Sequence, residues 1–154
     1  MEVFLTGEVS IDLPHPEWGS PLHFEGYAPL DTLSFGNPHG ISFDSRAIQE
    51  RENIAPSWGT EVPGGINISF VEQVGEQRLK VWVFERGAGW TQACGTGAAA
   101  SVCAAVKRGI LHRDRSAYVQ LPGGELKISL NAERVQLTGP ARHCFSGYWR
   151  GVLA

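Results

Sequence analysis

Cys94 lies in the segment from Glu85 to Gly97, ERGAGWTQACGTG, which carries the densest set of reactive and anion-binding residues in the chain. The valine- and aromatic-rich residues before it predict a strand, and the alanine-rich residues after it predict a helix. A thiol at a helix start faces the positive end of the helix dipole and several unpaired backbone N–H groups. Both effects favour the thiolate, so Cys94 is a candidate base or nucleophile. The alternative is a buried structural cysteine in front of a Thr96 N-cap.

Two further polar clusters could take part in the same chemistry. Glu85 and Arg86 end the predicted strand, and Asn37, Pro38 and His39 form the other cluster. Alone, each has an ordinary explanation, an exposed ion pair at a turn or a turn with a surface histidine. A thiolate, a histidine and a carboxylate together can set the protonation state of a proton-transfer site. An arginine and a helix start can bind carboxylates. The combination suits a small zwitterionic substrate, such as an amino acid, and chemistry at its α-carbon.

The surrounding pattern predicts short strands and one buried central helix. The helix, residues 97–108, has almost no polar face, which is typical of a helix buried on all sides. A shorter helix of one or two turns is expected over residues 47–53. Strands are expected at residues 3–13, 41–43, 66–71, 79–84, 118–121, 126–130 and 135–138. We therefore expect an α+β fold in which a strongly curved antiparallel sheet or barrel wraps around one central buried helix.

Composition excludes several classes of function. A chain of 154 residues with a net charge of -3 is long enough for one domain, and its charge argues against a nucleic-acid surface. No apolar run reaches the length of a membrane span and no secretion signal is visible, so a cytoplasmic protein that contacts no membrane is expected. The three cysteines lack metal-ligand spacing, which predicts no metal site. Cys103 lies about 13.5 Å along the helix from Cys94 and, like Cys144, is interpreted as structural.

The segment 85–97 resembles the signature of the diaminopimelate epimerase family. The sequences GNPH at 36–39 and GIN at 65–67 resemble two further segments of that family in the same order, and LPGGEL at 121–126 and LTGPA at 137–141 resemble its C-terminal strands. Members of the family are about twice as long and have two similar lobes, each giving one cysteine to the cleft between them. The resemblance implies that residues 1–154 form a single domain similar to the C-terminal lobe, and that the N-terminal lobe is absent.

The resemblance implies a cofactor-independent, two-cysteine epimerisation of LL- to meso-diaminopimelate in lysine and peptidoglycan biosynthesis. One thiolate would remove the α-proton while a thiol on the opposite face donates one. It implies that Cys94 is one of these cysteines and that His39 and Glu85 set the protonation state of the pair. The substrate-binding residues that it implies are Asn37, Asn67, Glu85, Arg86, Gly95 and Thr96.

The source of the second cysteine leaves three hypotheses open. The chain could act with a complementary N-terminal lobe, which is favoured because an isolated lobe would expose an apolar interface. It could be a homodimeric amino-acid racemase with two Cys94 thiols facing across a symmetric cleft. It could also be a non-catalytic amino-acid-binding domain that kept the fold.

Overall fold

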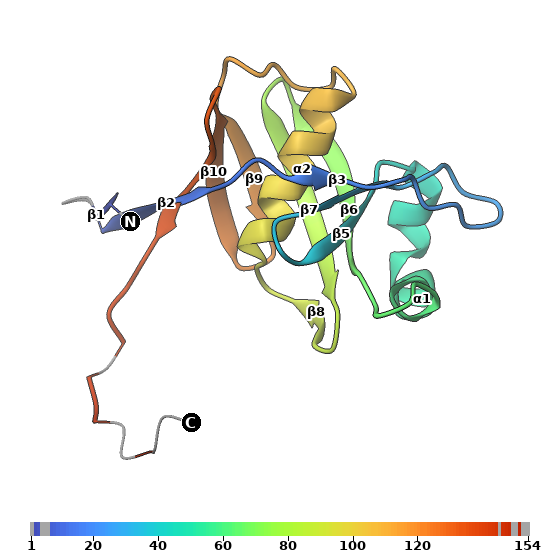
Figure 1. Cartoon of the computed structure of the whole chain (residues 1–154), viewed down its shortest axis with the longest axis horizontal. Coiled ribbons are helices and arrows are strands. Elements are labelled where there is room, and N and C mark those ends of the chain that lie inside the picture. Colours follow the sequence, from blue (N-terminus) through green and yellow to red (C-terminus); the bar gives the residue numbers. More distant parts are fainter. Residues whose placement is uncertain (1, 4–6, 145, 149–150, 152–154) are drawn as a thin grey trace.

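The computed structural model describes residues 2–3, 7–144, 146–148 and 151, which form one curved sheet and two helices (Figure 1). In the described part of the chain the sheet has eleven strands, in the order β1-β2-β11-β10-β9-β7-β6-β5-β4-β3, with β8 paired to β7. The strands are β1 (Glu2–Val3), β2 (Glu8–Leu13), β3 (Glu17–Trp18), β4 (Asp31–Ser34), β5 (Pro38–Ser42), β6 (Asn67–Gly75), β7 (Arg78–Glu85), β8 (Gly89–Thr91), β9 (Ala117–Leu121), β10 (Gly124–Leu130) and β11 (Val135–Pro140). The helices are α1 (Ser45–Glu61) and α2 (Gly95–Lys107).

Helix α2 lies inside the curve of the sheet and forms the centre of the main hydrophobic core (Figure 1). Its residues from Gly97 to Ala105 are all buried. Most are alanine or glycine, and such small side chains let the helix backbone pass close to the strands around it. Val81, Val119 and Ile128, from three different strands, are fully buried in the same core. The expected α+β fold, a curved sheet around one buried central helix, is confirmed.

The sheet is mixed, whereas the sequence analysis expected antiparallel pairing throughout. Strand β5 pairs in parallel with β6, and β7 pairs in parallel with β9. Parallel neighbours need a crossover connection of a dozen or more residues, commonly a helix. Helix α1 lies in the first connection and α2 in the second. The two helices therefore account for the two parallel pairs.

Helix α1 continues eight residues beyond the expected end at Asn53. Asp44 caps its start by accepting hydrogen bonds from the N–H groups of residues 46 and 47. Pro56 lies inside the helix, where proline is unfavourable. Trp58 compensates by packing between Phe24, at 4.3 Å between ring centroids, and Phe70, at 5.9 Å. A second aromatic core thus stabilises a turn of helix that the local sequence disfavours.

Strand boundaries also differ in places that matter for the site. Strand β5 begins at Pro38, so His39 lies within a strand and not in a turn. The expected strand 3–13 corresponds to β1 and β2, with residues 4–6 outside the described residues. Within the described residues, no helix is long and apolar enough to cross a membrane.

Candidate active site

Cys94 is the N-cap residue of α2. Its backbone is extended, with φ -137° and ψ 106°, and its Sγ accepts a hydrogen bond from the Gly97 N–H at 3.4 Å. The alternative with Thr96 as the cap is therefore wrong. A Cβ at position 97 would come within 3.2 Å of the Cys94 Sγ and of a Val83 methyl group, so the thiol packs where only glycine leaves room. The sequence placed Cys94 at the helix start correctly.

The Thr96 hydroxyl links Cys94 to two residues nearly sixty positions earlier in the chain. Its Oγ1 lies 3.6 Å from the Cys94 Sγ, 3.2 Å from the Asn37 Nδ2 and 3.1 Å from the His39 Nε2. Asn37 lies just before β5 and His39 is its second residue. The structure thus brings together three of the predicted site residues and Cys94, which we call the Thr96 cluster: Asn37, His39, Cys94 and Thr96.

The burial of His39 decides how protons are arranged in the Thr96 cluster. The residue has no exposed surface, and its Nδ1 has no hydrogen-bond partner among the described residues. An unpaired buried N–H is more costly than an unpaired acceptor, so the proton is best placed on Nε2, which then donates to Thr96. Asn37 also donates to the same oxygen. With both lone pairs occupied, the single Thr96 proton is left to point at the Cys94 sulfur.

Burial also shifts both titratable members of the Thr96 cluster. It lowers the pKa of His39 to about 4, so this side chain is neutral at pH 7 and acts as a hydrogen-bond donor. Burial raises the pKa of the Cys94 thiol, against the opposing effect of the hydrogen bonds from Thr96 and Gly97, and the charge of Glu85 raises it further. The helix start acts on Cys94 in the expected direction, but burial outweighs it. The resting form of Cys94 in this chain is therefore the thiol.

Asn67 joins the strands that carry the two predicted clusters. Its Nδ2 donates to the Pro38 carbonyl at 3.0 Å, and its Oδ1 accepts from the Arg86 backbone N–H at 2.9 Å. Only 5% of its surface is exposed. The Arg86 side chain is exposed and donates to the Gly64 carbonyl at 2.9 Å. Asn67 therefore fixes Pro38 relative to Arg86, and one donor and one lone pair of its amide are left for a ligand.

Thr91 is a site residue that the sequence analysis did not assign. Its Oγ1 donates to the Glu85 Oε1 at 2.5 Å, across the hairpin in which β7 and β8 pair. Glu85 is half-buried at the end of β7 and close enough to Cys94 for its charge to act on the thiol. Thr91 lies inside the segment 85–97. A hairpin register across Gly87 and Gly89 would have been the signal to find it.

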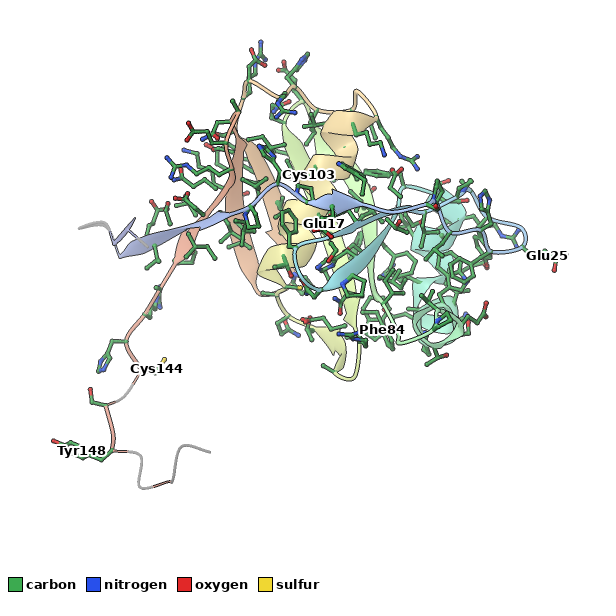
Figure 2. The ribbon with its side chains drawn as sticks, in the orientation of Figure 1. Glu17, Glu25, Phe84, Cys103, Cys144 and Tyr148 are labelled. Atoms are coloured by element: carbon green, nitrogen blue, oxygen red, sulfur yellow. The ribbon has the colours of Figure 1, made fainter. Side chains whose placement is uncertain are left out.

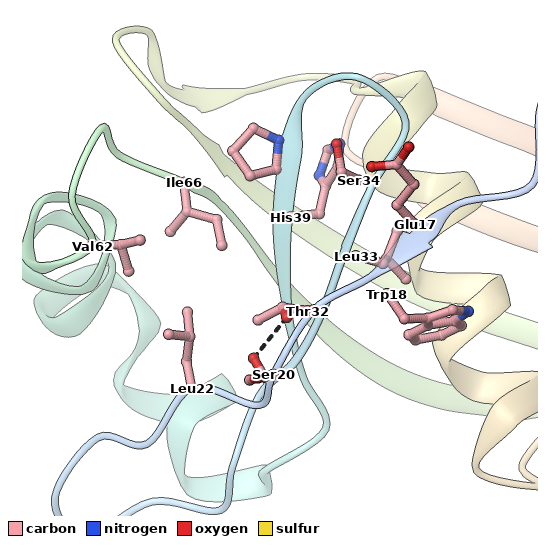
Figure 3. A pocket seen from close by; sticks show the side chains of 12 residues that line it. Glu17, Trp18, Ser20, Leu22, Thr32, Leu33, Ser34, His39, Val62 and Ile66 are labelled. Carbon is pink, nitrogen blue, oxygen red and sulfur yellow. Dashed lines mark hydrogen bonds between the residues drawn. The ribbon is translucent and has the colours of Figure 1, made fainter.

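A cavity of about 330 Å³ adjoins the site on the side of β5 (Figure 3). Pro38 and His39 form part of its wall, together with Leu33 and Ser34 of β4 and Trp18 of β3. Figure 3 also shows Val62, Ile66 and Leu22 on the opposite wall, which makes this cavity mostly apolar. The lining does not include Cys94, Glu85 or Arg86. The cavity therefore lies beside the Thr96 cluster and does not contain the thiol.

The other two cysteines are not positioned to act together with Cys94. Cys103 is buried within α2, and burial raises the pKa of its thiol to about 12. Cys144 is exposed on the C-terminal segment, which leads away from the sheet (Figure 2). All three thiols are free. Among the described residues, no group of three or more His, Cys, Asp or Glu side chains could hold a metal ion.

The fold is that of one half of known racemase and epimerase structures. A hydroxyproline epimerase from Agrobacterium vitis, solved with bound trans-4-hydroxy-L-proline, matches with a TM-score of 0.65 and 14% sequence identity, over 87% of this chain and 50% of that one. A predicted epimerase from Pseudomonas aeruginosa matches with a TM-score of 0.63 and 13% identity, over 86% of this chain and 55% of that one. At these identities the likeness establishes the fold alone.

Sequence comparison gives the family. The profile of the family described as diaminopimelate epimerase matches residues 32–144. A diaminopimelate epimerase from Nostoc punctiforme is 45% identical over 133 residues, which are 82% of this chain and 47% of the relative. One from Synechocystis is 40% identical over 149 residues, 92% of this chain and 50% of the relative. The chain belongs to the diaminopimelate epimerase family, and it spans about half the length of the curated relatives it matches.

Proposed function

We propose that this chain supplies one of the two cysteines of a cofactor-independent diaminopimelate epimerase, which interconverts the LL and meso forms. The observation that carries the proposal is the Thr96 cluster, in which a buried network directs a hydroxyl proton at the Cys94 sulfur beside the Glu85 carboxylate. Such an arrangement suits a thiol that gains and loses a proton in each turnover. This function carries with it the expectation of a cytoplasmic enzyme of lysine and peptidoglycan biosynthesis.

In the proposed reaction a thiolate on one face of the α-carbon takes its proton, and a thiol on the other face donates one. The C–H bond on the first face breaks, its electron pair stays on carbon, and a new C–H bond forms on the opposite face. Cys94 starts as the donor, because burial keeps it protonated. The thiolate left after donation is stabilised by the Thr96 hydroxyl and the Gly97 N–H. In the reverse direction the same thiolate is the base.

Substrate binding would use the charged groups around the Thr96 cluster. The N–H groups of Gly95 and Thr96 belong to the first turn of α2, where backbone donors have no partner within the helix. They suit the α-carboxylate. The Glu85 carboxylate suits the α-ammonium group. The exposed Arg86 guanidinium suits a carboxylate at the edge of the site. Asn37 and Asn67 would orient the substrate through those amide donors and acceptors that form no hydrogen bond within the chain.

The second cysteine would come from a complementary N-terminal lobe. Neither Cys103, buried two and a half turns along α2, nor Cys144, on the segment that leaves the sheet, suits the opposite face of a carbon held at Cys94. A second copy of the chain is the alternative source. The two sources differ in what the isolated chain can do, because a homodimer would carry both cysteines.

The test fuses this chain to the segment of the Nostoc punctiforme relative that the chain does not match. Exchange of the α-proton of diaminopimelate in deuterium oxide is followed by NMR. We expect exchange and epimerisation by the fusion and none by the isolated chain. Cys94→Ser should reduce the rate by about a thousand-fold or more. A serine hydroxyl is a far weaker acid than a thiol, so at neutral pH it neither donates its proton readily nor forms the alkoxide that could act as the base.

The matched control is Cys103→Ser, which changes the same atom at a position away from the site and should leave the rate of the fusion unchanged. Activity of the isolated chain would favour the homodimer. A folded fusion that binds diaminopimelate without exchanging its α-proton would refute the enzymatic proposal and leave the non-catalytic binding domain. Full activity of the Cys94→Ser fusion would exclude Cys94 as the proton-transferring residue.

A further inference from the structure

A second cavity, of about 530 Å³, lies against the last turns of α2, at the opposite end of the helix from Cys94. The helix is about 20 Å long, so the two places are separate. The curved sheet does not close here, and the segment from β2 into β3 crosses over the helix (Figure 1). Three apolar residues of its lining, Cys103, Val106 and Leu130, are called its floor. The volume is in the range of small-molecule sites.

The rim of this cavity is basic. Its cationic lining residues are Lys107 and Arg113, and the lining contains no acidic residue. The Lys107 Nζ lies 3.9 Å from the centroid of the Trp18 ring, which also lines the cavity. The ammonium group is thereby held at the cavity wall by a cation–π contact. The floor is apolar and the rim carries positive charge.

Arg113 keeps most of its hydrogen-bonding capacity. Its Nη2 donates to the Asn131 carbonyl at 3.3 Å, which anchors the side chain and uses one of its five N–H groups. Within the described residues neither Arg113 nor Lys107 forms an ion pair with a carboxylate. Two arginines nearby in the sequence do form such ion pairs: Arg108, next to Lys107, pairs with Asp31, and Arg115, two residues after Arg113, pairs with Glu76. Two cations without a counter-ion thus face a cavity with an apolar floor.

We propose that this cavity binds a small carboxylate with an apolar, planar body. The carboxylate would lie between Lys107 and Arg113, and the body would cover Cys103, Val106 and Leu130 beside the Trp18 ring. Neutral compounds of the same shape would lose the charge-assisted hydrogen bonds. Cations would be repelled by both side chains and would also lose hydration free energy on entering the cavity. The inference does not depend on the epimerase proposal, because it uses none of the residues of the Thr96 cluster.

The test uses naphthoate as the probe, with naphthamide and naphthylmethylammonium as neutral and cationic compounds of the same shape. Each is titrated into the isotopically labelled full chain and followed by NMR. We expect saturable shifts at the Trp18 indole and at the amides of Lys107, Arg113 and Leu130. A naphthoate Kd on the order of 1 mM is consistent with a ligand of this size, and both analogues should bind at least about ten-fold more weakly.

Lys107→Gln and Arg113→Gln should each raise the naphthoate Kd about ten-fold. Arg115→Gln is the matched control, because it removes an arginine two residues from Arg113 that lies outside the cavity lining, and the Kd should not change. All three residues are exposed, so folding should be retained. Equal affinity for the three probes, shifts centred on residues 94–97, or no saturation up to about 10 mM naphthoate would each overturn the proposal.

Discussion

Replacing Thr96 with valine tests the hydrogen-bond arrangement that we infer around Cys94. Valine has nearly the same shape and a similar helix propensity, so the change removes the hydroxyl and little else. The His39 Nε2–H then loses its acceptor in a place with no access to solvent. An unsatisfied buried donor costs about 1–3 kcal/mol. Asn37 is half-buried and can turn its amide to water, so it should add little.

The same substitution should make Cys94 less reactive. The thiolate keeps the Gly97 N–H but loses the Thr96 hydroxyl, so the pKa of Cys94 rises further above that of the unmodified chain. A hydrogen bond to a charged group contributes about 1.5–3 kcal/mol, so alkylation of Cys94 at neutral pH should slow by at least about ten-fold. Thr96→Ser keeps the hydroxyl and is the matched control for both effects.

Two measurements check this prediction, denaturant unfolding and the rate of iodoacetamide alkylation as a function of pH. The alkylation is done in a Cys144→Ser background, because Cys144 is an exposed thiol and would react first. Cys103 is buried and its pKa of about 12 keeps it protonated. The inferred arrangement is wrong if Thr96→Val and the unmodified chain unfold at the same denaturant concentration and show the same pH profile of alkylation.

Two further predictions concern His39 and Gly97. Because burial lowers the pKa of His39 from 6.5 to about 4, the unfolded chain takes up this proton first as the pH falls, and stability should decline between about pH 6.5 and pH 4. Urea unfolding at both ends of this range gives the loss of unfolding free energy with pH, which should be larger in the unmodified chain than in His39→Gln by an amount on the order of 3 kcal/mol. An identical pH dependence in the variant would contradict the assignment. Gly97→Ala should destabilise the chain by about 1–3 kcal/mol in the same unfolding assay, although alanine favours helices, because its Cβ would lie 3.2 Å from the Cys94 Sγ; an unchanged or higher stability would show that the thiol can move away.

The sequence supplied the candidate site residues as a list, and their roles stay predictions. It did not supply their arrangement. Cys94 could be placed from sequence because a helix start is a local feature, set by the residues just before and after it. Its raised pKa could not, since burial depends on strands that lie far from it in the chain. The same holds for His39, whose neutral state follows from having no exposed surface. The Thr91–Glu85 hydrogen bond needed the register of a hairpin.

The sequence by itself determined the central helix and the curved sheet around it. A run of small apolar residues with no polar face has one stable environment, a buried one, and short apolar strands must surround it. Only the tertiary structure decided which strands pair in parallel, because pairing depends on where the crossover helices pack. It alone extended α1 through Pro56, where packing of Trp58 offsets a local helix breaker. It also joined Asn37 and His39 to Thr96, since contacts across nearly sixty residues are fixed by the fold and not by local preference.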